Sequence, residues 1–294
     1  MTPTSQRRRR AAAIITAIAA TVATATACSP AASHAPAAPV PAGRQPAPPT
    51  PYVMPLLVDV PANHVDAQLR CVAVLIAPQW ALTAAHCVTD GQAGDAAPCS
   101  DSHAGEPAPV AEMRFSVRDG SSNRAQGGTV IATDPIPQPG FHFDTQGPAP
   151  TSDIALLHLV QPATATPVPL IARDPALGAP VTLYGWGHQN PCTTPAPEQL
   201  QQLHTTISQC HTRTTAGEIC TDPAATPTGP QAACSGDGGG PLITDTPAGP
   251  SLAGLMSRGS PHCGDWTDVA TSVPAFEPWI TTTTGVNLRP VVPA

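Results

Sequence analysis

Residues 82–87 read Leu-Thr-Ala-Ala-His-Cys and follow a strand-length apolar run that starts at Cys71. The small side chains of Ala84 and Ala85 let the chain turn tightly just before His86. Histidine is the side chain whose ordinary pKa lies nearest to neutral pH, so it can take up and return a proton as a general base. A lone histidine is usually structural or exposed, but one held by such a turn is a candidate general base.

Two more stretches with catalytic features follow in the chain. Residues 152–157 read Ser-Asp-Ile-Ala-Leu-Leu and set Asp153 directly before an apolar run. Such an aspartate alone is ordinary turn chemistry, but in chain order after the histidine it becomes a candidate partner for the imidazole. Residues 234–242 read Cys-Ser-Gly-Asp-Gly-Gly-Gly-Pro-Leu. These glycines allow a sharp turn in which backbone N–H groups can point at an anion.

Together, the three stretches resemble the histidine, aspartate and nucleophile segments of chymotrypsin-type serine proteases. The resemblance covers about residues 52–285. It implies an all-β fold of two antiparallel six-stranded β-barrels with a short C-terminal helix. It also implies that Asp153 orients His86 and stabilises its imidazolium, and that the N–H groups of Gly236 and Gly238 form an oxyanion hole.

The nucleophile position departs from the family pattern. That pattern is Cys-x-Gly-Asp-Ser-Gly-Gly-Pro-Leu, so Gly238 stands where the family has its serine. Acyl transfer by this mechanism needs a hydroxyl that is hydrogen-bonded to the histidine, and glycine has none. Ser235 lies three residues back on the other limb of the turn, and we do not expect it to stand in. The oxyanion donors are backbone groups, so they survive the replacement.

A second departure concerns activation by cleavage. Family zymogens are cut after a basic residue to expose a start like Ile/Val-Val-Gly-Gly, and the new amine pairs with the aspartate beside the nucleophile, here Asp237. No such start occurs, and Arg44 followed by Gln45-Pro46 is a poor match. A buried carboxylate without a partner is costly. The sequence therefore predicts either another partner for Asp237 or a loosely formed oxyanion loop.

The resemblance also implies a substrate pocket. It puts Ala232 at the floor, where trypsin-like members have an aspartate. Ser257 and Gly259 would line one wall, and Arg258 between them replaces a tryptophan of the family. Asp268 would fall near the back of the pocket and attract a basic side chain, or it would be a solvated loop aspartate. Tyr184-Gly185-Trp186-Gly187 resembles the Gly-Trp-Gly strand end of the family.

The nine cysteines include Cys28, and setting it aside leaves an even set. In an exported protein such a set implies four disulfides. No Cys-x-x-Cys pair occurs and the other histidines are scattered, so we expect no metal and no cofactor. The resemblance implies the first three of the following pairs and elimination leaves the fourth: Cys71–Cys87, Cys210–Cys220, Cys234–Cys263 and Cys99–Cys192.

The N-terminus resembles an export signal. Arg7 to Arg10 precede an uncharged stretch, and residues 25–28 read Ala-Thr-Ala-Cys. These residues fit ordinary signal cleavage and also resemble a lipoprotein box, so plain secretion and a lipid on Cys28 both remain open. We predict a signal over residues 1–28, a disordered linker over 29–51 with eight prolines in 23 residues, and a flexible tail over 286–294.

Composition limits the partners and the fold. The chain has 294 residues and no lysine, and beyond Cys28 nine arginines face 20 acidic residues, a net charge of −11. A nucleic-acid partner needs a basic face, so this balance disfavours one.

The 39 prolines favour short strands over long helices, with one short helix near residues 274–282. We expect a monomer that is secreted or anchored to the outer face of a bacterial cell membrane through Cys28.

Three functions follow from these observations. The first is a protease homologue without peptidase activity that binds a peptide or protein in the retained cleft. The second is an active serine endopeptidase, which would need an unrecognised nucleophile or a serine in the true gene. The third is a structural envelope lipoprotein that kept the barrels for their stability. The intact His86, Asp153 and oxyanion glycines favour the first over the third.

Overall fold

The computed structural model describes residues 43–61, 65–89, 110–142, 152–189, 196–260, 262–288 and 290–292. Several predictions from the sequence lie outside these residues. They are the export signal over 1–28, the lipid on Cys28, the linker up to residue 42, and the Cys99–Cys192 disulfide. In the described part of the chain, no helix combines the length and the apolar character needed to cross a bilayer.

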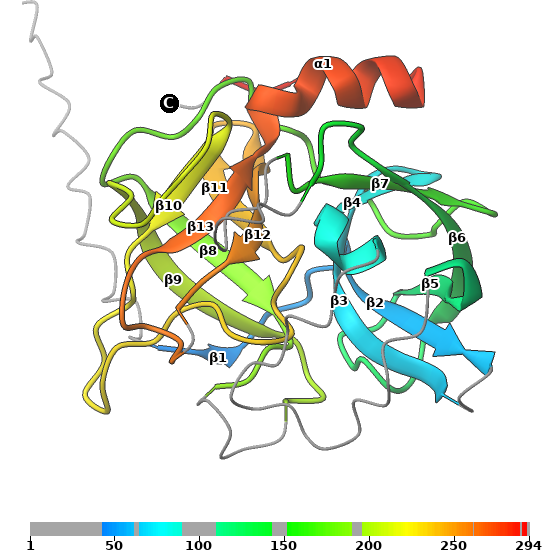
Figure 1. Ribbon diagram of the computed structural model, residues 1–294, viewed down its shortest axis with the longest axis horizontal. Helices are drawn as coiled ribbons and strands as arrows, with labels where there is room; N and C mark the ends of the chain where they lie inside the picture. Colours follow the sequence, from blue (N-terminus) through cyan, green and yellow to red (C-terminus); the bar gives the residue numbers. More distant parts are fainter. Residues whose placement is uncertain are drawn as a thin grey trace, which may run out of the picture. The chain divides into compact units, whose positions relative to one another are not determined.

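The first half of the folded chain forms a closed antiparallel barrel of six strands in the order β2-β3-β4-β7-β6-β5. Figure 1 shows it on the right, in blue to green. The strands are β2 Val53–Val60, β3 Val65–Ala77, β4 Trp80–Thr83, β5 Arg114–Asp119, β6 Thr129–Pro137 and β7 Ala155–Leu159.

The second half forms another barrel beside the first (Figure 1). Its strands follow the order β9-β10-β13-β12-β11-β8, and a pairing of β8 with β9 closes the ring. The strands are β8 Pro180–Gly185, β9 Gln201–Ser208, β10 Glu218–Thr221, β11 Pro241–Thr246, β12 Gly249–Arg258 and β13 Asp268–Ser272. The predicted all-β fold of two six-stranded antiparallel barrels is therefore confirmed.

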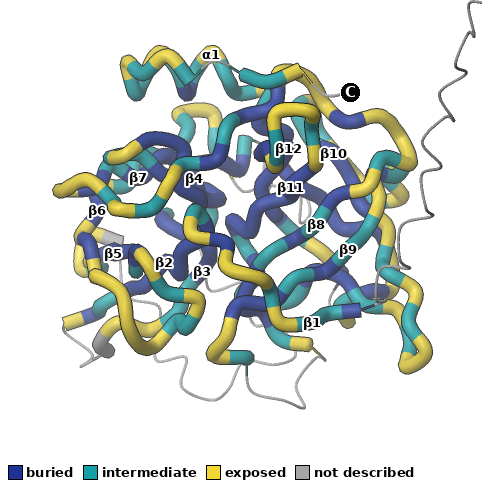
Figure 2. Tube along the Cα trace, turned by 180° about the vertical axis from the view of Figure 1, so that it is seen from behind, coloured by how far each residue is buried: buried dark blue, intermediate teal, exposed yellow. Residues whose placement is uncertain are grey.

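Strand β3 shows how the barrels share one core. Side chains of a strand alternate between its two faces. Cys71, Ala73 and Leu75 point into the first barrel, whereas Val74 and Ile76 belong to an apolar cluster that also includes residues of β11, β12 and the C-terminal helix. Both faces of β3 are thus buried from Cys71 to Ala77, which explains the unbroken apolar sequence of that part of the strand. Figure 2 shows buried residues along the strands and exposed ones mainly in the connecting turns.

The predicted C-terminal helix is confirmed as α1 Val273–Thr284, slightly longer than the expected 274–282. Its start is capped by Ser272, whose side chain accepts a hydrogen bond from a backbone N–H of the first turn. Pro274 lies in that turn, where no donor is needed. The helix ends at Gly285, whose φ of 66° is the left-handed conformation that terminates many helices.

The folded unit begins earlier than the sequence predicted. The linker prediction is wrong for residues 43–51, because Gln45–Pro46 form strand β1 and pair with β9. The side chain of Arg44 is 2% exposed. Composition predicts disorder where little apolar surface can be buried. Here a proline-containing edge strand and one buried charged side chain hold the segment instead.

The segment predicted as a flexible tail over 286–294 has a backbone pairing at Val291. Val291 donates its N–H to the carbonyl of Leu170 at 2.7 Å, and its own carbonyl accepts from Ala172 at 2.7 Å. Two backbone hydrogen bonds therefore attach the segment to the loop before β8.

Three of the predicted disulfides are present, and the fourth lies outside the described residues. Cys71–Cys87 joins β3 to the turn that carries His86, and Cys210–Cys220 joins β10 to the segment after β9. Cys234–Cys263 joins the glycine-rich loop to the segment before β13. Disulfides persist outside the reducing cytosol, so three of them indicate an extracellular protein.

Candidate functional site

His86 lies in the short 3₁₀-helix η2 Ala85–Val88, directly after β4. Ala84 and Ala85 are fully buried, as expected for a tightly packed turn. The Cys71–Cys87 disulfide ties the turn to β3. The imidazole is therefore attached to a rigid part of the first barrel.

Asp153 precedes β7 and holds the imidazole in one orientation. Its side chain is buried, and its Oδ1 accepts the backbone N–H of His86 at 2.9 Å. Its Oδ2 lies 2.7 Å from Nδ1 of the same residue. An ionised carboxylate can only accept, so Nδ1 carries the proton and Nε2 is left as the basic nitrogen.

Ser257 supports Asp153 from the second barrel. The register of β12 against β13 shifts between Met256 and Arg258, and such an irregularity re-aims a side chain. The hydroxyl of Ser257 donates to Oδ2 of Asp153 at 2.6 Å. Burial raises the pKa of Asp153, but the attraction of His86 and the hydrogen bonds from His86 and Ser257 outweigh it and hold that pKa below its usual range.

The glycine-rich loop of residues 234–240 brings Gly238 against this pair. A Cβ built on Gly238 would lie 2.7 Å from Nε2 of His86 and 3.2 Å from Sγ of Cys71. The carbonyl of Gly238 accepts from Val72 at 2.8 Å, which fixes the loop against the first barrel. A side chain at position 238 would thus point at the basic nitrogen.

Two backbone donors of the loop have no acceptor in the part of the chain that the structure describes. The N–H of Asp237 donates to the carbonyl of Cys234 at 3.0 Å, and that of Gly239 donates to Met256 at 2.8 Å. Across the described ranges, the N–H groups of Gly236 and Gly238 have no such acceptor. Gly236 has a φ of 92°, which glycine adopts at little cost. These two donors are available for an anion.

The carboxylate of Asp237 is fully buried beneath this loop. It accepts the N–H of Gly187 at 2.8 Å and that of Cys234 at 2.9 Å. Both terminal guanidinium nitrogens of Arg44 also contact it. The sequence left open either another partner for Asp237 or a loose loop, and Arg44 is that partner.

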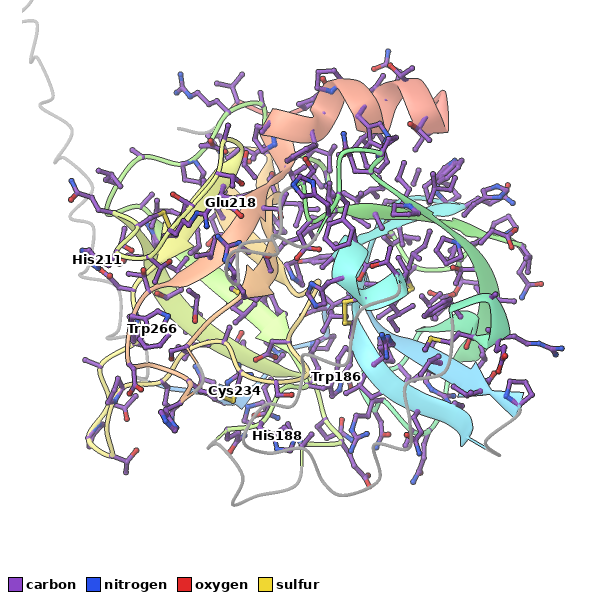
Figure 3. All side chains as sticks on the ribbon, in the orientation of Figure 1. Trp186, His188, His211, Glu218, Cys234 and Trp266 are labelled. Atoms are coloured by element: carbon purple, nitrogen blue, oxygen red, sulfur yellow. A yellow bond between two sulfur atoms is a disulfide. The ribbon has the colours of Figure 1, made fainter. Side chains whose placement is uncertain are left out.

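Gly185 and Gly187 make room for this carboxylate. A Cβ on Gly185 would lie 2.1 Å from Oδ1 of Asp237, and one on Gly187 would lie 2.3 Å from Oδ2. Between them, Trp186 is buried and its Nε1 donates to two backbone carbonyls at 3.1 Å each. Figure 3 labels Trp186 and Cys234 at this end of the second barrel. The resemblance to a Gly-Trp-Gly strand end did not reveal this steric role.

Two predicted pocket residues, Ala232 and Ser257, have contacts that the sequence did not predict. Ala232 is buried, and its carbonyl accepts from Arg44 at 3.1 Å. The hydroxyl of Ser257 points at Asp153, as described above. Arg258 pairs with Glu218 of β10 through contacts of 2.5 and 3.0 Å (Glu218 is labelled in Figure 3).

Asp268 is a buried carboxylate, 2% exposed, so the alternative of a solvated loop aspartate is wrong. Its Oδ2 accepts from the N–H of Ala233 at 2.7 Å. Its Oδ1 has no hydrogen-bond partner among the described residues and lies 2.4 Å from where a Cβ of the exposed Gly259 would be. Burial, reinforced by Asp237, raises the pKa of Asp268 to about 7, against the opposing effects of Ala233 and Arg44.

The structure also groups Cys71, His86 and Cys87 within 4.8 Å of one another. The two cysteines are bonded to each other. A metal binds cysteine as the thiolate, which a disulfide does not offer. This group therefore lacks the ligands of a metal site.

The comparisons with known proteins agree with this geometry. A sequence model of the trypsin family matches residues 43–280. Human kallikrein-11 is 28% identical over 211 residues, which are 67% of this chain and 64% of that protein. Mouse kallikrein 1-related peptidase b3 is 28% identical over 240 residues, 75% of this chain and 82% of that protein.

Among solved structures, this chain is similar to neuropsin, described as a serine protease expressed in the limbic system of mouse brain. The TM-score is 0.59 at 25% identity, and the superposition covers 80% of this chain and 94% of that one. With two closed barrels and a family match over most of its length, this chain belongs to the trypsin family of serine proteases.

Proposed function

We propose that this protein is an exported trypsin-family member that lacks peptidase activity and binds a peptide or protein ligand at the site of His86, Asp153 and the loop of residues 234–240. One observation carries the proposal. Position 238 faces the basic nitrogen of His86, and the residue there has no side chain. The base and the backbone donors remain, but the attacking oxygen is absent.

The loss of this oxygen is expected to abolish turnover. In subtilisin, removal of the nucleophilic serine lowers kcat by roughly a million-fold. Ser235 is a poor substitute, because it lies three residues before Gly238 and its carbonyl accepts the backbone N–H of His188 at 3.0 Å (His188 is labelled in Figure 3). We propose no other residue of this chain as the nucleophile.

The wild-type protein is therefore expected not to react with a fluorophosphonate probe, which labels activated serines. Intact-mass spectrometry of the purified protein before and after incubation measures this directly. The matched control is His86→Ala. Labelling that maps to a residue of this chain and disappears in His86→Ala would support the second candidate, an active endopeptidase.

The buried Asp268 favours a ligand with a basic side chain. Its Oδ1 has no partner among the described residues, and it lies behind the exposed Gly259. An arginine or lysine reaching this oxygen would provide the missing contact. Because the pKa of Asp268 is about 7, the carboxyl is mostly neutral at pH 6 and mostly ionised at pH 8. A cationic side chain is attracted only by the ionised form.

We therefore expect a blocked Ala-Ala-Arg peptide to bind about tenfold more tightly at pH 8 than at pH 6, since one pH unit either side of the pKa changes the ionised fraction by about that factor. Calorimetric titration against blocked Ala-Ala-Ala gives the preference. Asp268→Asn removes both the preference and its pH dependence, whereas Asp265→Asn, at an exposed position, leaves them unchanged. Equal affinity for the two peptides would exclude this ligand class.

A third function, that of a structural envelope lipoprotein, predicts no ligand at all.

We propose a bacterial envelope location, with export by the signal over residues 1–28 and a lipid on Cys28 that leaves the folded domain outside the membrane. The mass of the N-terminal peptide of the exported protein tests the lipid. An unmodified terminus would leave plain secretion.

A further inference from the structure

Arg44 and Asp237 form an ion pair beneath the loop of residues 234–240 although 193 residues separate them in the chain. The side chains of both are almost fully buried, with 2% and 0% exposed. The terminal guanidinium nitrogens of Arg44 contact both carboxylate oxygens. Such two-point contacts fix orientation as well as charge.

The position of Arg44 is itself determined by its neighbours. Its backbone N–H donates to Oε1 of Gln231 at 2.6 Å, and its guanidinium also donates to the carbonyl of Ala232 at 3.1 Å. The next two residues form β1 against β9. The N-terminal segment thus holds the guanidinium of Arg44 beside Asp237.

Asp237 in turn determines where the loop donors point. It stands between Gly236 and Gly238, whose N–H groups have no acceptor among the described residues. Its carboxylate also accepts the N–H of Cys234 within the same loop. Without a cation, this buried carboxylate would be driven toward solvent. The two peptide units on either side of it would then turn with it.

We infer that Arg44 is a built-in positioning residue that keeps the anion-binding loop of residues 234–240 formed in the uncleaved chain, so that the protein needs no proteolytic activation. Its guanidinium takes the place that a newly exposed N-terminal amine has in the zymogens this chain resembles. The inference concerns the formation of the loop and does not depend on whether the site binds a ligand or turns one over.

The chemistry of the cation offers a distinguishing property. A guanidinium stays charged at every pH that proteins tolerate, whereas an α-amine loses its proton in mildly alkaline solution. A loop held by Arg44 therefore keeps its counter-ion at pH 10. Asp268 of β13 is a further charged group that acts on this pair, and it is already ionised in the alkaline range.

Hydrogen exchange with mass spectrometry on the ligand-free full chain tests the inference. In Arg44→Gln, the amides of Asp237, Gly239 and Gly240 are expected to exchange at least about a hundredfold faster than in the wild type. The matched control is Arg118→Gln, because the guanidinium of Arg118 donates to two backbone carbonyls and has no contact with this loop, since it lies in the first barrel. Unchanged protection of the loop in Arg44→Gln would overturn the inference.

Two further measurements cover the case in which Arg44→Gln does not fold. In Arg44→Lys, the melting temperature is expected to fall more steeply than in the wild type as the pH rises above about 10.4, because pairing with Asp237 raises the pKa of the folded-state ammonium above that of the unfolded chain, whereas a guanidinium stays charged. Mass spectrometry of the exported protein is expected to find residues 43–46 in one uncut peptide. Parallel melting curves, or a cut beside Arg44, would contradict the inference and leave the fluorophosphonate test of function unaffected.

Discussion

Gly238→Ser is expected to make the protein react with a fluorophosphonate probe that leaves the wild type unlabelled. The new Cβ would point at Nε2 of His86, which Asp153 already holds in the basic tautomer. The two backbone donors are in place to receive the developing oxyanion. We expect the labelling rate to rise at least ~10³-fold above background. This is less than the roughly million-fold loss of kcat when the nucleophile of subtilisin is removed.

The imidazole must move slightly for this to happen. A Cβ at 2.7 Å from Nε2 is too close, so the ring must turn away from position 238 by a few tenths of an ångström while Nδ1 keeps its hydrogen bond to Asp153. Gly238→Ala introduces the same crowding without the hydroxyl and is the matched control. The double variant Gly238→Ser/His86→Ala tests dependence on the base.

The outcomes separate clearly. Labelling of Gly238→Ser that disappears in the double variant shows that the rest of the machinery is preorganised. In a second outcome, Gly238→Ser stays unlabelled while its loop amides remain protected from exchange. The loop is then formed, but its N–H groups and His86 do not activate a serine at position 238, and the proposed roles of these groups are wrong. If the loop amides also lose protection, the added Cβ has disrupted the loop, and the inference about Arg44 is not affected.

The fold and the histidine–aspartate pair were predictable because they leave local patterns in the sequence. Short apolar runs between turn residues indicate strands. Small residues before His86 and the apolar run after Asp153 mark the two turns. Three of the cysteine pairs follow from the same resemblance. Apart from the cysteine pairs, which span 10 to 29 residues, each of these signals lies within a few residues along the chain.

The contacts that complete the site leave no such local signal. Arg44 stands in a segment whose proline content indicates disorder, and its partner lies 193 residues away. The hydroxyl of Ser257 reaches Asp153 only because β12 is irregular at that point. The burial of Asp268 depends on the packing of β13 against neighbouring segments. Only the fold shows which side chains these turns and strands bring together.

Substitution of a glycine beside Trp186 is expected to have a large effect on stability. Gly187→Ala is expected to lower the free energy of unfolding by about 3–5 kcal/mol, the range found when a buried ion pair is broken. The reason is steric, because the added methyl would lie 2.3 to 2.6 Å from three atoms of the Asp237 carboxylate. Urea denaturation with unchanged slope measures the loss. The backbone of Gly187 is not left-handed, so conformational strain does not contribute.

Gly178→Ala separates this contact from a general intolerance of alanine. Gly178 has a φ of 81° and open space around its Cβ position, so alanine there costs only the roughly 1–2 kcal/mol of a left-handed backbone. A double variant Gly187→Ala/Arg44→Gln then tests the mechanism. If both changes act by displacing Asp237, their combined loss is smaller than the sum of the single losses. Additive losses, or a Gly187→Ala loss no larger than that of Gly178→Ala, would show that the carboxylate tolerates the methyl. In that case the absence of side chains at Gly185 and Gly187 would not be the reason that the Arg44–Asp237 ion pair fits beneath the loop.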